Sequence, residues 1–76
     1  MLVTVAEAHK NLFAGEAVSL TVPTVDGEVT VLPHHEPLVS RLKEGTITVR
    51  TTDGQQTFPA TSGVLEISNN QVTVLL

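Results

Sequence analysis

The stretch AVSLTVPTVDGEVTVLP, residues 17–33, decides the fold class of this chain. On both sides of Asp26-Gly27, apolar and polar residues alternate with a period of two, as they do in strands with one buried face. In the first half, Val18, Leu20 and Val22 are expected to form the apolar face. The Asp-Gly pair favours a tight turn because glycine accepts the positive φ that such turns require. The stretch therefore predicts a β-hairpin.

The same alternation recurs in three other runs, GTITVR from Gly45, GVLEIS from Gly63 and QVTVLL from Gln71. Residue pairs that tolerate a positive φ separate the runs. These pairs are Glu44-Gly45, Asp53-Gly54 and Asn69-Asn70. Short strands joined by tight turns at this spacing predict an all-β fold, an antiparallel sandwich or barrel.

Residues 5–14, VAEAHKNLFA, do not follow the alternation. Most of them are good helix formers, so a short helix is one interpretation. The segment is short and has no clear capping residue. We expect instead the end of a first strand, a turn near His9 to Asn11, and a second strand through Phe13.

Length and composition define one domain, residues 1–76, and exclude several classes of protein. The net charge is −4, and four strong cations are too few to neutralise a run of phosphates, so no nucleic-acid partner is expected. There is no cysteine, which removes disulfides and thiolate metal sites. No apolar run approaches the ~20 residues of a spanning helix, and no direct lipid insertion is expected.

Two adjacent histidines, His34 and His35, lie between Pro33 and Pro37 and next to Glu36. Imidazole and carboxylate are zinc ligands, and a small metal-dependent enzyme using these residues is one alternative. Neighbours on an extended chain point to opposite faces, however, so the two rings cannot easily hold one ion. We interpret the segment as a stiff surface corner in which one histidine bonds inward and the other faces water. No metal or cofactor is expected.

Other arrangements with catalytic potential are weak. Asp26 and Glu28 flank a turn glycine and have no pocket that would separate their pKa values. The hydroxyls of Thr61 and Ser62 have no arranged base, and no glycine-rich phosphate loop precedes a helix. The chain is therefore expected to be non-catalytic.

One segment, LPHHEPL at residues 32–38, fits a Leu-Pro-x-His-x-Pro-Leu signature. With it, residues 12–49 and 61–76 resemble the N-terminal domain of the epsilon subunit of F-type ATP synthases. Shorter matches support the resemblance in the same order along the chain. They are FAGE at residues 13–16, Gly27-Glu28, LKEG at residues 42–45 and SGVLEI at residues 62–67.

The resemblance implies a small antiparallel β-sandwich of about ten short strands without the C-terminal helical hairpin that many family members carry. In the family this domain lies at the foot of the central stalk, binds the gamma subunit and the ring of c subunits, and has no active site. It couples proton-driven rotation of the ring to gamma for ATP synthesis. The implied location is the cytoplasmic face of a bacterial inner membrane, as a peripheral protein held by the complex.

The resemblance also assigns contact residues. On the gamma side they are His35, Pro37, Leu38, Val39 and Ser40. On the c-ring side they are Asp26, Gly27, Glu28, Val29, Thr30 and Val31. This chain has Thr24 and Thr30 where the family usually has glycine, which bears on the shape of the ring-facing hairpin. A stand-alone sandwich that binds a different protein is the other alternative.

Overall fold

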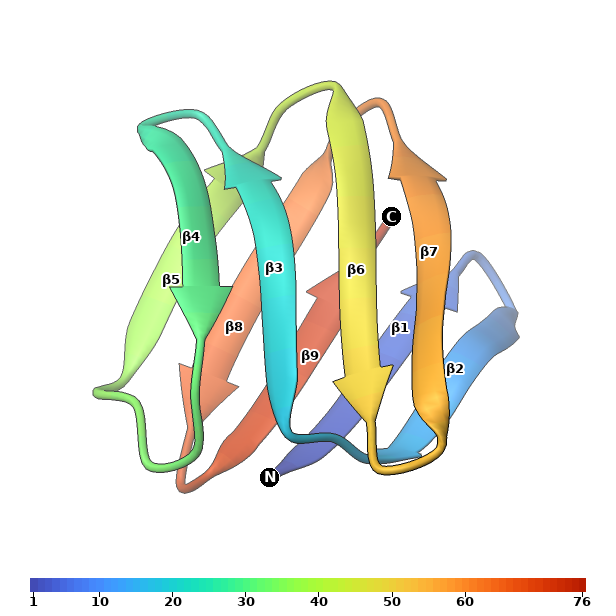
Figure 1. Ribbon diagram of the computed structural model, residues 1–76. Coiled ribbons are helices and arrows are strands. Elements are labelled where there is room, and N and C mark those ends of the chain that lie inside the picture. The colour runs from blue at the N-terminus through green and yellow to red at the C-terminus, as the bar shows by residue number, and fades with distance from the viewer.

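The computed structural model describes residues 1–76 and contains nine strands and no helix, so no helix could cross a membrane (Figure 1). The strands are β1 (Leu2–Glu7), β2 (Lys10–Glu16), β3 (Ser19–Thr24), β4 (Gly27–Val31), β5 (Leu38–Leu42), β6 (Gly45–Thr51), β7 (Gly54–Ala60), β8 (Gly63–Ser68) and β9 (Gln71–Leu75). The all-β prediction is confirmed, with nine strands where about ten were expected.

The strands form one curled sheet that folds into two layers. Its order is β2-β1-β9-β8-β5-β3-β6-β7, and β4 pairs with β3. In Figure 1, β4, β3, β6 and β7 make the front layer, while β5, β8, β9, β1 and β2 make the back layer. The link between the layers is narrow, because β3 and β5 share a single register pair, Thr24 with Leu42.

One strand pair differs from the antiparallel prediction. β1 and β9 run parallel, with Leu2 beside Gln71 and Ala6 beside Leu75. Parallel neighbours need a long connection, and here the whole chain between them supplies it. The alternation of apolar residues is the same for both directions of pairing, so the sequence pattern could not reveal this one.

The core between the layers is aliphatic. The inward residues predicted from the alternation are buried in the structure. They are Leu20, Val22, Ile47, Val49, Leu65, Ile67, Val72 and Val74. Val3, Val5, Val31 and Leu42 complete the centre of the cluster. Branched aliphatic side chains suit a pleated surface, which explains how a core forms with hardly any aromatic residues.

Val18 was expected to lie in the core, but it does not. It is 48% exposed, while its neighbour Ala17 is 5% exposed. The two residues precede β3, where the chain passes from the back layer to the front layer. The amide of Ala17 donates to the carbonyl of Met1, and that of Val18 donates to the carbonyl of Arg50. This crossing interrupts the period of two.

Residues 5–14 form part of a hairpin and no helix. β1 and β2 pair antiparallel, with Val5 beside Phe13, and the turn lies at Ala8 and His9. The turn is therefore slightly earlier than the expected His9 to Asn11. Ala8 has a φ of 50°, in the left-handed region that an L-residue adopts only at a cost.

The predicted turn residues adopt a positive φ at three of the four hairpin sites. Gly27 and Gly54 have φ values of 123° and 136°, and Asn69 and Asn70 have values of 52° and 60°. Gly45 is the exception. Its φ is not positive, and it lacks a side chain for a different reason: a Cβ there would lie 2.8 Å from Cβ of Pro23.

Two of these hairpins have the same construction. Thr24 Oγ1 donates to the carbonyl of Gly27 at 2.6 Å and accepts from the amide of Asp26 at 3.2 Å. Thr51 repeats both bonds across the next Thr-x-Asp-Gly turn, at 3.4 and 3.2 Å. The hydroxyl of Thr24 thus stabilises the β3–β4 hairpin.

Replacing Gly45 by alanine should lower the free energy of unfolding by about 1–3 kcal/mol, because the new methyl group overlaps Pro23. Gly15→Ala is the matched control. A Cβ at Gly15 would lie 3.8 Å from Cζ of Phe13, an ordinary contact, so this variant should be neutral or slightly more stable. Chemical denaturation measures both, and equal stabilities for the two variants would contradict the close contact.

Ala8→Gly should raise the free energy of unfolding by about 0.5–1 kcal/mol, because relief of the left-handed strain exceeds the entropic cost of glycine. Ala14→Gly serves as the control, since Ala14 is an exposed strand residue without positive φ. That substitution should destabilise by a similar amount. A loss of stability in both variants would show that Ala8 carries no strain.

Candidate functional site

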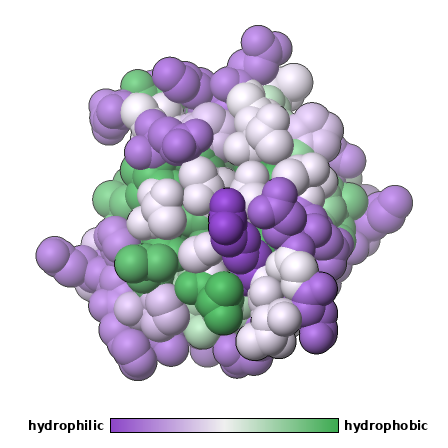
Figure 2. Space-filling view, in the orientation of Figure 1, coloured by the Kyte–Doolittle hydropathy of each residue, from purple (hydrophilic) through white to green (hydrophobic).

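The outer surface of the front layer is polar. Thr30, Thr21, Thr48 and Thr57 are register neighbours across β4, β3, β6 and β7 and form one row. The hydroxyls of Thr21 and Thr30 lie 3.1 Å apart. Figure 2 shows this side, where pale and purple residues predominate and green ones occupy only small separate areas. Cross-strand threonine pairs stabilise a solvated sheet, and this surface needs no partner.

The outer surface of the back layer is more apolar. Four of its outward side chains are exposed aliphatic residues: Val39 at 69%, Leu75 at 54%, Leu2 at 44% and Val64 at 38%. Val64 and Leu75 are direct register neighbours on β8 and β9. Exposed apolar groups that gather on one face of a small domain are typical of an interaction surface. We call these four residues and the residues between them the back outer face.

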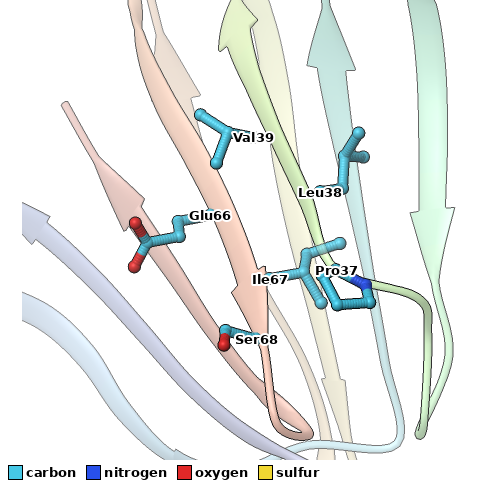
Figure 3. A pocket seen from close by; sticks show the side chains of 6 residues that line it. All are labelled: Pro37, Leu38, Val39, Glu66, Ile67 and Ser68. Carbon is cyan, nitrogen blue, oxygen red and sulfur yellow. The ribbon is translucent and has the colours of Figure 1, made fainter.

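A shallow, open depression of about 420 Å³ lies where β5 begins beside the end of β8 (Figure 3). Its lining residues are Pro37, Leu38, Val39, Glu66, Ile67 and Ser68. An enclosed pocket covers most of a small ligand, which this depression cannot do. Its shape suits contact with another protein.

The residues predicted for the gamma side are contiguous but face two directions. Val39 points out onto the back outer face. Leu38 and Ser40 lie on the other side of β5 and are half-buried, as the alternation of a strand requires. Ser40 Oγ donates to the carbonyl of Arg41 at 3.3 Å. The structure therefore brings Pro37, Leu38 and Val39 together at the depression and turns Ser40 away from it.

The loop with the two histidines is fixed by its backbone. The amide of His34 donates to Oδ1 of Asn70 at 2.8 Å, which ties the loop to the β8–β9 turn. His34 has a φ of 66°. Nδ1 of His35 lies 2.8 Å from the carbonyl oxygen of Glu36. The amide of His35 donates to the carbonyl of Leu32 at 3.2 Å. The expected inward bond of one histidine is wrong, because the half-buried His35 ring bonds to the exposed carbonyl of the next residue, Glu36.

The histidines do not gather with other ligand groups. No cluster of three or more His, Cys, Asp or Glu side chains lies where it could hold one metal ion. His34, His35 and Glu36 follow one another along a loop, and Glu28 and His9 belong to other hairpins. The metal-dependent alternative has no ligand set in this structure.

The residues predicted for the c-ring side form the β3–β4 turn and all of β4. Asp26 and Glu28 are exposed near the turn, and Thr30 points out from the front layer. Val31 is fully buried and Val29 is half-buried, so Val31 is a core residue and cannot contact a partner. Alternation along β4 separates these residues, because only every second side chain faces outward.

Sequence reasoning missed several residues of the back outer face, namely Leu2, Val64, Leu75 and Glu66. A weak signal exists in GVL at residues 63–65 and VLL at residues 74–76, where consecutive apolar residues must point to both sides of a strand. Such runs indicate an outer surface that is not purely polar.

The chain was compared with known protein families, curated proteins and solved structures. Residues 1–76 match the family model described as ATP synthase, Delta/Epsilon chain, beta-sandwich domain. The ATP synthase epsilon chain of Bordetella petrii is 42% identical over 74 residues, which cover 96% of this chain and 52% of the relative. That of Neisseria meningitidis (strain FAM18) is 39% identical over 77 residues, which cover 99% and 55%. The chain thus spans about half the length of the curated relatives it matches.

Solved structures show the same fold. A chain in the Euglena gracilis mitochondrial ATP synthase (OSCP/F1/c-ring) superposes with a TM-score of 0.88 at 22% identity, covering 96% of this chain and 48% of that chain. A chain in the central stalk/c-ring structure of the Tetrahymena thermophila mitochondrial ATP synthase has a TM-score of 0.81 at 16% identity, covering 97% and 60%. These structures show the fold alone, whereas the match of the family model over all 76 residues shows that the chain belongs to the ATP synthase delta/epsilon chain β-sandwich domain family.

Proposed function

We propose that this chain is a non-catalytic rotor component of the central stalk of an F-type ATP synthase. In this role it couples the c-ring to the gamma subunit during proton-driven ATP synthesis. The observation that carries the proposal is the family match over the whole chain. The names of the bacterial relatives, ATP synthase epsilon chain, support it.

The geometry of β4 suits a coupling role. Asp26 and Gly27 lie at the start of this five-residue strand, and the loop with His35 follows its end. Five extended residues span about 17 Å, so the β3–β4 turn and the loop with His35 lie at opposite ends of one strand. A close-packed sandwich deforms little, and a push at one end is transmitted to the other.

The gamma side is assigned to the loop and the start of β5, with Pro37 and Val39 as its outward residues. These side chains bury apolar area without ordering a long flexible chain. Val39 continues into the back outer face, which offers the larger apolar surface. The contact of the His35 ring with the carbonyl of Glu36 lies directly before Pro37.

The c-ring side is assigned to the β3–β4 hairpin, with Asp26 and Glu28 as a small acidic patch. Exposed charges of this kind contribute only about 0.2–1 kcal/mol each to an interface. Their role would be to set the register of the contact, while gamma holds the domain. The resulting location is the cytoplasmic face of the membrane, through the complex and without lipid insertion.

Val39→Asp should weaken binding of the gamma subunit by about tenfold or more, or at least about 1.4 kcal/mol, because it places a charge on the apolar contact. Val18→Asp is the matched control, since Val18 is also an exposed valine but lies outside the back outer face. Calorimetric titration with gamma measures both variants. If the Val39→Asp variant binds gamma as tightly as the parent chain does, gamma does not bind at this surface.

Replacing Glu28 by glutamine and by lysine tests the ring side. If Glu28 contacts the ring electrostatically, lysine should weaken ring association and proton-coupled ATP synthesis more than glutamine does. The difference should shrink as salt rises, because ions screen exposed charges. If the parent chain and both variants show the same ring association and ATP synthesis at low salt, Glu28 does not contact the ring.

A further inference from the structure

Glu66 is a carboxylate in the middle of the back outer face. On β8 it lies between Val39 of β5 and Thr73 of β9, its two register neighbours. Val64, two residues earlier on the same strand, points to the same side. Figure 3 shows the carboxylate extending away from Val39 at the edge of the depression. The two direct register neighbours of the carboxylate are thus one apolar and one hydroxyl side chain.

No group of this chain pairs with Glu66 in the structure. The single ion pair joins the N-terminal amine of Met1 to Glu16, and Glu66 takes part in no side-chain hydrogen bond. Arg41 is the other charged residue close by, since it is the register neighbour of Val64 on β5. It lies diagonally from Glu66 and forms no ion pair with it. Water therefore solvates the carboxylate while the surface is free.

A partner that covers the apolar residues must also remove this water. Val39 lies beside Glu66 on β5 and Val64 lies before it on β8, so a partner cannot bury both valines while the carboxylate keeps its full hydration. Burial of an unpaired carboxylate opposes binding strongly, whereas a cation or several N–H donors opposite it compensate for the lost water. The position of Glu66 thus limits which protein surfaces bind here.

We propose that Glu66 is a specificity-determining residue of the back outer face, and that the partner places a Lys or Arg side chain against it. The inference rests on the proposed function, in which that partner is the gamma subunit. Arg41 carries the opposite charge on the adjacent strand, so the surface has a negative and a positive end that can orient a partner. A partner with an acidic and a basic group in the complementary order docks in one orientation only.

The test compares gamma binding by Glu66→Gln, Glu66→Lys and a control, Gln55→Lys. Gln55 is exposed on β7, in the other layer, and its variant changes the net charge by the same single unit as Glu66→Gln. Glu66→Lys should weaken binding by about tenfold or more, Glu66→Gln by less, and Gln55→Lys hardly at all. The loss should diminish at high salt. Thermal unfolding of each variant verifies that the fold is retained.

The outcomes separate this inference from the proposed function. Normal binding by both Glu66 variants, with weakened binding by Val39→Asp, overturns the role of Glu66 and leaves gamma on this surface. Normal binding by both Glu66 variants and by Val39→Asp overturns the assignment of gamma to the back outer face. Equal weakening by Glu66→Gln and Gln55→Lys also overturns the inference, because the effect would then follow net charge and not position.

Discussion

The close approach of Gly45 to Pro23 is the constraint on which the two-layer architecture depends. At this corner the chain leaves the back layer at the end of β5 and enters the front layer as β6. The amide of Lys43 donates to the carbonyl of Pro23 at 3.0 Å, and a Cβ on Gly45 would overlap the proline ring. β3 and β5 share a single register pair, Thr24 with Leu42, and the amide of Val25 donates to the carbonyl of Arg41 beside it, so the strand contacts between the layers are concentrated at this corner.

The packing of the layers gives their outer surfaces different chemistry. Both layers contribute aliphatic residues to one core, but the front layer turns a row of threonines to solvent and the back layer turns Val39, Val64 and Leu75. A domain of this size buries only about 60% of the surface its unfolded chain exposes. A partner that covers Val39, Val64 and Leu75 would bury further apolar surface, and its binding to the folded state would add to the stability of the domain.

The candidate site was only partly predictable. The resemblance identified the loop with His35, the start of β5 and the β3–β4 hairpin, because these carry local sequence signatures. It could not tell which side chains of these segments face outward. The direction of Ser40 and the burial of Val31 follow from the alternation within each strand and from the layer that lies behind it. Glu66 joined the site only when β8 was seen to pair with β5.

The sequence by itself determined the all-β class, the strands with strict alternation and the turns at Gly27, Gly54 and Asn69-Asn70. These are local properties, since a period of two and a positive φ depend on neighbouring residues. Only the tertiary structure decided the parallel pairing of β1 with β9, the exposure of Val18 and the role of Gly45. It also revealed β5 and β7, whose weak alternation did not identify them as strands. Each of these features depends on contacts between residues far apart in the chain, which no local pattern encodes.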